Sequence, residues 1–304
     1  MDGVAVSETK MEKEMIHTPG HITLMLPLYL DQNDTLQAKS EAEQIELVYD
    51  KSEIALQFYE GFLLALDTLE KMGHSVKLKV IDTENRPWKV RKLVESGALE
   101  NTDLIIGPLY AKVFDEVAPY AYQHCLPLIS PTIKTDNIVD RNDFVFKQIP
   151  SEESMVFAMG KYLARSDSTT KMVLHYGASD EQKMLWKFRQ GLEANGPHPA
   201  KFPAYDIYKS GSDSIRNGLS VSGRNNLVIL SNNQVKLAGL LRKLTNWSED
   251  AYIVGFAPSN WQRHKNLEID HFDDLRIHMP TAFHIDYDDL EVQEFVLKFR
   301  LKFG

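Results

Sequence analysis

The single cysteine of the chain and its histidine neighbour are the first candidates for chemistry. His124 precedes Cys125, and a thiolate nucleophile next to a base is a known catalytic pair. Neighbouring side chains usually point apart, however, and this pair falls where an expected helix gives way to a strand, which favours a buried, inert thiol. The chain has no dinucleotide or phosphate-binding glycine loop, no G-x-S-x-G elbow and no H-E-x-x-H helix. We therefore expect a protein that is not an enzyme and that needs no cofactor.

Two groups of histidines and aspartates are the candidates for a metal site. His264 and His271 lie near three aspartates, but their spacing does not aim ligands at one point. Asp286, Asp288 and Asp289 resemble part of a calcium loop but lack its glycine and its terminal glutamate. Solvated loops and helix-capping acids are the better interpretation, and we expect no metal.

Composition narrows the remaining classes of function. The chain has 304 residues, of which 43% are hydrophobic and 25% charged, which is typical of a globular protein. Its net charge of −9 argues against a nucleic-acid partner. One cysteine cannot form an intramolecular disulfide, and no window reaches the roughly 18 apolar residues of a membrane span. We expect neither a nucleic-acid-binding nor an integral membrane protein.

Both ends of the sequence suggest a piece of a longer protein. Residues 1–20 are polar and lack the apolar stretch of a signal peptide, which indicates a linker or tail. The last residues form an amphipathic pattern that reaches a glycine and stops.

The apolar pattern predicts alternating strands and helices. The expected elements of the first half are strand 21–30, polar loop 31–40, helix 51–72, strand 76–81, helix 87–96, strand 104–106, helix 112–124 and strand 126–130. The second half repeats this build, with helix 151–164, strand 171–175, a helix ending at 193, strand 204–208, loop 210–214, strand 227–230, helix 235–244 and strands 252–255 and 275–279. Nearly continuous apolar strands indicate parallel sheets that are covered on both faces. We expect an α/β protein with two Rossmann-like, doubly wound lobes: 21–150 plus 281–304, and 151–280.

One segment carries the resemblance to a known family. Residues 103–131, DLIIGPLYAKVFDEVAPYAYQHCLPLISP, resemble a landmark of the type I periplasmic binding proteins, which include the leucine/isoleucine/valine receptors. In that family a strand ends in Gly-Pro, a helix follows, and a short strand ends in Ser-Pro. Residues 55–67, 144–150 and 295–304 are similar to the first helix, the hinge crossing and a late helix. The resemblance implies two lobes with a hinge and an interlobe cleft, where ligands bind.

The resemblance also points to two more specialised groups. The Gly-Pro-Leu-Tyr sequence and polar lead-in are similar to binding-protein-like domains that follow LysM modules in envelope proteins of Bacteroidetes. The same motif is similar to that of lipoprotein activators of penicillin-binding proteins, whose carboxyl-terminal domain acts through protein contact. That second group supplies the rival function.

The first-lobe ligand residues follow from the family pattern. A hydroxyl residue after the Gly-Pro position holds the ligand carboxylate in the amino-acid receptors; here the stretch is Tyr110, Ala111 and Lys112. Backbone N–H groups at a helix start, together with Lys112, would favour an anion. Thr132 and Lys134 follow the Ser-Pro strand end, where an inward lysine would disfavour a ligand ammonium group.

The remaining expected ligand residues come mostly from the second lobe. Tyr176 and Asp180 occupy the loop where the family stacks an aromatic side chain on the ligand. Asn232 and Phe256 follow the next strands, and Tyr29 joins the same rim from the first strand. The hydroxyl and aromatic positions of the family are altered together here. A two-lobe scaffold without a small ligand therefore stays open as the alternative.

These patterns predict a solute-binding, receptor-like domain of the periplasm or cell envelope. It would close by hinge motion on a small polar or anionic ligand, either amino-acid-like or cell-wall-derived. The alternative is a protein-interaction module of an envelope lipoprotein that regulates peptidoglycan synthesis, with peptidoglycan or an envelope protein as its partner.

Overall fold

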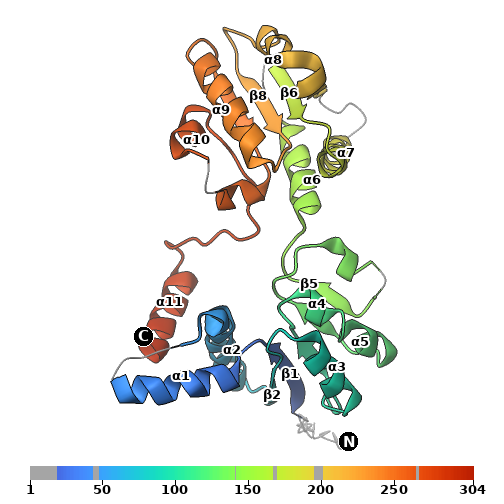
Figure 1. The fold of residues 1–304 in the computed structure, drawn as a ribbon, viewed down its shortest axis with the longest axis vertical. Coiled ribbons are helices and arrows are strands. Elements are labelled where there is room, and N and C mark those ends of the chain that lie inside the picture. Colours follow the sequence, from blue (N-terminus) through green and yellow to red (C-terminus); the bar gives the residue numbers. More distant parts are fainter. Residues whose placement is uncertain (1–18, 44–47, 141, 167–169, 195–200, 265–266) are drawn as a thin grey trace, which may run out of the picture. The chain divides into compact units, whose positions relative to one another are not determined.

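The chain forms two compact units, which we call lobe 1 and lobe 2. The computed structural model describes residues 19–43, 48–140, 142–166, 170–194, 201–264 and 267–304 (Figure 1). Lobe 1 contains residues up to Ile133, Ile138–Gln148 and Asp286–Gly304, and lobe 2 contains Lys134–Asn137 and Ile149–Ile285. The expected tail over residues 1–20 lies, up to residue 18, outside the described residues.

Lobe 1 is built on a five-stranded parallel sheet in the order β2-β1-β3-β4-β5. Its strands are β1 (Gly20–Leu26), β2 (Val76–Asp82), β3 (Leu104–Ile106), β4 (Leu128–Ser130) and β5 (Val145–Lys147). In a sheet that is covered on both faces, successive side chains enter opposite cores. Met25 accordingly packs with Ile105 and Phe114, whereas Leu24 and Leu26 pack on the other face with Ala55.

Helices cover both faces of this sheet. Lobe 1 contains α1 (Leu30–Glu43), η1 (Asp50–Ser52), α2 (Glu53–Lys71), α3 (Pro87–Glu95), α4 (Ala111–Phe114), α5 (Ala118–Gln123) and α11 (Leu290–Phe303). Side chains of α2 pack on the face of Leu24, and side chains of α3, α4 and α5 pack on the face of Met25. The α2 helix ends in a Schellman motif: Gly73 has a φ of 85°, its N–H donates to Glu70, and the His74 N–H donates to Leu69.

The Gly-Pro landmark has a physical reason at Gly107. This residue follows β3 with a φ of 85°, which side chains rarely adopt. A Cβ at this position would lie 2.2 Å from the carbonyl oxygen of Met25 in the neighbouring strand β1. Only glycine allows the chain to turn this close to β1.

Lobe 2 is built on a four-stranded parallel sheet in the order β7-β6-β8-β9. Its strands are β6 (Thr170–His175), β7 (Ala204–Asp206), β8 (Asn225–Ile229) and β9 (Ile253–Phe256). Its helices are η2 (Asp136–Ile138), which spans the boundary between the units, α6 (Glu152–Leu163), α7 (Ser179–Glu193), α8 (Ile207–Asn217), α9 (Gln234–Ser248), η3 (Ser259–Arg263) and α10 (Ile269–Asp274). Side chains of α6 and α7 pack on one face of the sheet, and side chains of α8 and α9 pack on the other. Both lobes are thus doubly wound, and the predicted fold class is confirmed.

Two glycines allow the neighbouring helices α6 and α7 to pack at very short range. A Cβ on Gly160 would lie 2.2 Å from the Phe188 carbonyl oxygen, and one on Gly191 would lie 2.1 Å from the Phe157 carbonyl oxygen. Backbone therefore meets backbone across this helix pair, as small residues at a helix interface permit.

The sequence-based elements were wrong at four places. The loop expected over 31–40 belongs to α1, whose Leu, Gln, Ala, Lys and Glu residues favour helix although few are apolar. The loop expected over 210–214 belongs to α8, which is interrupted at Gly211 with a φ of 70° and buries Ile215. The helix expected over 112–124 is split into α4 and α5, with Pro119 at the start of α5. Cys125, which follows α5 and was expected to be buried, is exposed. The strand expected over 275–279 is reduced to a bridge between Phe256 and His278.

Candidate functional site

The expected first-lobe ligand residues lie where strands of the lobe 1 sheet end. We call this set the lobe 1 edge: Tyr29 after β1, Tyr110, Ala111 and Lys112 after β3, and Thr132 after β4. In parallel sheets the carboxyl ends of all strands meet at one edge, where ligands of α/β proteins bind.

Asp82, at the end of β2, fixes the loop that carries Tyr29. Its Oδ1 accepts the N–H groups of Leu28 and Tyr29 at 2.9 and 3.1 Å, and its Oδ2 accepts that of Leu30 at 2.9 Å. Tyr29 itself has a φ of 50°, an uncommon conformation for a tyrosine that these bonds stabilise. One carboxylate therefore holds three successive backbone donors at this edge.

Three tyrosines gather around this loop. The rings of Tyr29 and Tyr49 meet edge to face at a centroid distance of 5.2 Å. Burial raises the pKa of Tyr29, nearby Tyr110 raises it further, and Lys51 opposes both effects. No motif marks Tyr49 or Lys51 in the sequence, because they come from the segment before α2 and not from a strand end.

The other expected ligand residues of the first lobe differ in exposure and in their hydrogen bonds. Tyr110, Ala111 and Lys112 are exposed around the single turn of α4. The Thr132 hydroxyl donates to the Leu109 carbonyl oxygen and so joins the loops after β3 and β4. Lys134 is half-buried, in the short segment Lys134–Asn137 that groups with lobe 2.

Among the expected ligand residues of lobe 2, Tyr176 is held by hydrogen bonds of both its backbone and its side chain. Its N–H donates to the buried Glu181 carboxylate at 2.6 Å, and its hydroxyl donates to the Lys236 carbonyl oxygen at 3.0 Å. Burial, followed by the nearby Tyr208 and Glu181, raises the pKa of Tyr176 from its ordinary value near 10 to about 12. The phenol therefore stays neutral well above physiological pH.

Lys236 occupies the aromatic surface that the sequence predicts for a ligand. The rings of Tyr176 and Tyr208 lie edge to face at 5.2 Å, and the Lys236 ammonium group lies 5.1 and 4.8 Å from their centroids. Cation–π attraction is effective at such distances. Sequence reasoning missed Tyr208 and Lys236, because both lie within helices and not at a recognised motif.

Asn232, after β8, carries a buried oxygen that has no hydrogen-bond partner among the described residues. The side-chain oxygen of Asn260, after β9, is in the same state. A hydrogen bond joins the two segments that carry these asparagines: the fully buried Trp261 donates from Nε1 to the Ser231 carbonyl oxygen at 2.8 Å. Buried polar atoms normally have a partner, which water or a ligand can provide.

Asp180 and Phe256 lie in contrasting environments. Asp180 is exposed in the first turn of α7, where a carboxylate complements the helix dipole. Phe256 is buried at the end of β9, with its ring stacked on His278 at 5.2 Å.

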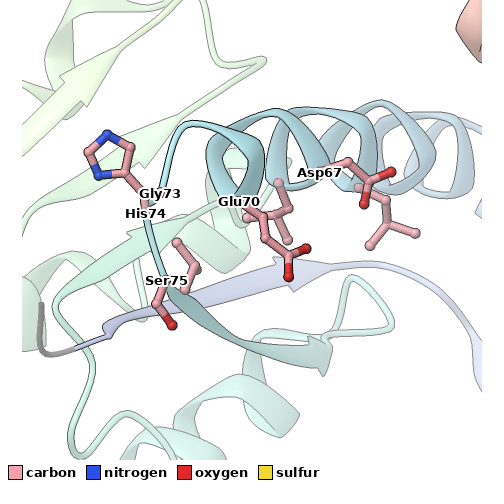
Figure 2. A pocket seen from close by; sticks show the side chains of 8 residues that line it. Asp67, Glu70, Gly73, His74 and Ser75 are labelled. Carbon is pink, nitrogen blue, oxygen red and sulfur yellow. The ribbon is translucent and has the colours of Figure 1, made fainter.

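A separate, acidic pocket lies in lobe 1 where α2 leads into β2. Figure 2 shows Asp67 and Glu70 on the helix, followed by Gly73, His74 and Ser75, which lead into the strand. Asp67 is already paired, because the Lys302 ammonium group of α11 donates to its Oδ2 at 2.5 Å. This pocket lies at the amino end of β2, whereas the lobe 1 edge lies at the carboxyl ends of the strands.

The described residues contain neither a candidate metal site nor a candidate membrane span. Within the described ranges, no three histidine, cysteine, aspartate or glutamate side chains are grouped so that they could hold a metal ion. No helix in the same part of the chain is long and apolar enough to cross a bilayer.

Comparison with known proteins gives matches at the level of structure. Neither the protein-family models nor the curated proteins match this sequence. A putative branched-chain amino acid ABC transporter protein from Rhodospirillum rubrum is 14% identical, with a TM-score of 0.64 over 94% of this chain and 78% of that chain. An ABC transporter substrate-binding protein from Desulfitobacterium hafniense is 17% identical, with a TM-score of 0.56 over the same shares. Full-length LpoA from Haemophilus influenzae is 13% identical, with a TM-score of 0.55 over 93% of this chain and 47% of LpoA. Two parallel, doubly wound sheets, the strand-end landmarks and these neighbours agree: the chain has the fold of the type I periplasmic binding proteins.

Proposed function

We propose that the protein is a non-enzymatic solute-binding domain that closes on a small polar or anionic ligand. The ligand would be amino-acid-like or cell-wall-derived, and the protein would act in the periplasm or cell envelope. As part of this proposal, the division expected from the sequence defines the functional parts: a tail (1–20), a first lobe (21–150 plus 281–304) and a second lobe (151–280). These bounds differ by a few residues from those of the compact units. Its fold neighbours include a D. hafniense substrate-binding protein in complex with Leu, at a TM-score of 0.53.

The observation that carries the proposal is the unpartnered oxygen of Asn232 at the end of β8. An unsatisfied buried acceptor costs about 1–3 kcal/mol, a cost that a ligand donor would remove. The neighbouring Asn260 oxygen adds a second acceptor of the same kind. Polar ligands are fixed by a few such groups at the carboxyl ends of strands.

Positive side chains support an anionic group on the ligand. Lys112 is exposed beside Tyr110, and Lys134 follows the end of β4. A ligand that carries both a donor for Asn232 and an acid for the lysines fits an amino-acid-like or muropeptide-like molecule.

Isothermal titration calorimetry against amino-acid and muropeptide panels tests this function. We expect heat from one ligand class, weakened about tenfold or more in an Asn232→Ala or a Lys112→Ala/Lys134→Ala variant. Lys243→Ala is the matched control, because Lys243 is exposed in the second half of α9, whose first turn follows the end of β8. Unchanged affinity in both site variants would refute the assignment of the site.

A second function is favoured by Lys236. Its ammonium group covers the rings of Tyr176 and Tyr208, so the protein itself fills the aromatic surface of lobe 2. A module that acts through protein contact, as proposed for an envelope regulator of peptidoglycan synthesis, needs no free aromatic surface. Recovery of a cell-wall synthase from envelope extract, together with no calorimetric heat from the panels, would select this function.

A further inference from the structure

A basic surface lies on lobe 2 along α6, and the solute-binding proposal does not use it. Its lining residues are Ala158, Lys161, Tyr162, Arg165, Ser166 and Arg224, around a cavity of about 620 Å³. Three of these six side chains are cationic and none is acidic. The whole chain has a net charge of −9, so this local excess of positive charge runs against the overall balance.

A buried amide positions one side of this cavity. Asn226 is fully buried; its oxygen accepts from Arg224 Nε at 2.9 Å, and its Nδ2 donates to the Ser166 hydroxyl at 3.2 Å. Arg224 is thereby held in place, and within the described residues its terminal guanidinium nitrogens make no hydrogen bond or ion pair. The side chain of Arg165 likewise makes no ion pair or hydrogen bond within the described part of the chain.

Helix capping accounts for only part of this charge. Lys161 and Arg165 lie at the end of α6, where cations interact favourably with the helix dipole. Arg224, however, precedes β8 and belongs to a different element. Two segments separated in sequence thus bring cations to one cavity.

An apolar cavity of about 270 Å³ adjoins the basic one and shares Ala158 and Tyr162 with it. Its other lining residues are Met159, Phe256, His278, Met279 and Pro280. Tyr162 is 65% exposed and stands between the two cavities. We call the two cavities together the α6 groove.

The basic half of the α6 groove has a different place in the lobe from Tyr176 and Asn232. It lies at the amino ends of β6 and β8, since Ser166 and Arg224 precede these strands. Tyr176 and Asn232 follow the carboxyl ends of the same two strands. The apolar half includes Phe256, one of the expected ligand residues, at the end of β9. The basic half is therefore a separate surface, and its function does not depend on solute binding.

We propose that the α6 groove binds an acidic peptide segment of a partner protein, with an apolar side chain next to the acidic residues. The guanidinium groups of Arg165 and Arg224 match carboxylates, and the adjoining pocket accepts the apolar side chain. Cavities of about 620 and 270 Å³ are larger than a small anion fills.

Fluorescence anisotropy with a labelled peptide that alternates glutamate and leucine tests this proposal on the whole chain. We expect binding that weakens as ionic strength rises. Arg165→Glu should weaken binding about tenfold or more, and Tyr162→Ala should weaken it as well. Arg189→Glu is the matched control, because Arg189 is an exposed arginine of lobe 2, on α7 and outside the groove, and it should leave affinity unchanged.

The outcomes separate the proposal from its alternatives. Failure of the wild-type protein to bind the acidic peptide, or equal binding of a lysine–leucine peptide, would overturn it. Equal losses of peptide affinity in Arg165→Glu and Arg189→Glu would show that the loss reflects the overall charge and not the groove, and would also overturn the proposal. Binding only to phosphatidylglycerol vesicles would assign the groove to a membrane surface. Arg165→Gln, with circular dichroism as the check on folding, replaces Arg165→Glu if that variant does not fold.

Discussion

Replacement of Gly160 by alanine tests how α6 and α7 are held together. These helices matter for both proposed surfaces, because α6 lines the α6 groove and α7 supplies Glu181, which fixes the Tyr176 loop. The substitution adds one Cβ, which would lie 2.2 Å from the Phe188 carbonyl oxygen and 3.2 Å from the Gly191 Cα. Both neighbours are backbone atoms, so a side-chain rotation cannot relieve the clash.

Two opposing effects set the size of the change. In the interior of a helix, alanine is more favourable than glycine by about 1 kcal/mol of free energy. Overpacking of a tight interface costs about 1–3 kcal/mol, and the upper end applies where rigid backbone has to move. We therefore expect Gly160→Ala to lower the free energy of unfolding by about 1–2 kcal/mol.

Urea unfolding, followed by circular dichroism and by hydrogen exchange of α6 and α7 amides, measures this change. Gly239→Ala is the matched control, since Gly239 lies in α9 of the same lobe and a Cβ there meets nothing within 4 Å. That control should gain up to about 1 kcal/mol. A Gly160→Ala protein as stable as the wild type, with unchanged exchange in α6 and α7, would refute the close packing of these helices.

Three further predictions concern the strand-end residues of lobe 2. Glu181→Gln weakens the charge-assisted bonds to the Tyr176 and Ala178 N–H groups and should cost about 1–3 kcal/mol in urea unfolding, whereas the exposed Asp180→Asn should change it little. Because the pKa of Tyr176 is higher in the folded protein than in the unfolded chain, its contribution to stability is complete below pH about 10 and is lost as pH rises to about 12. Spectrophotometric titration should show a phenol that titrates later than ordinary tyrosines, and Tyr176→Phe should remove both this late phenol and the corresponding slope. A wild-type titration without a phenol near pH 12, or a late phase that is unchanged in Tyr176→Phe, would contradict it. Asn232→Ala should leave thermal stability unchanged or slightly higher, because the lost oxygen has no partner, and a large loss of stability would show that the oxygen is already satisfied.

The fold was predictable because its signals are local and repeated. Apolar strand runs, Pro87 at a helix start and the Gly-Pro pair after β3 each reflect a steric or hydrophobic requirement that the structure displays. The errors arose where polarity was taken for a loop, as in α1, or where a helix is interrupted, as at Gly211. Strand pairing also depends on partners distant in the chain, which explains why 275–279 forms only a bridge.

The positions of the candidate residues at strand ends were predictable from the sequence, but their contacts were not. The order of strands and loops places Tyr176 and Asn232 after strands, whereas the contact of Lys236 with Tyr176 and Tyr208 depends on tertiary placement. The α6 groove was missed for the same reason, since Arg165 and Arg224 are 59 residues apart in the numbering.

The most direct test of the solute-binding proposal is a nuclear magnetic resonance titration with the amino-acid and muropeptide panels. We predict that one ligand class shifts the backbone signals of Tyr29, Tyr110, Tyr176 and Asn232 at a common saturation, with Arg165 and Arg224 unaffected. Signals that stay unchanged at all four residues, with every ligand of both panels, would contradict it.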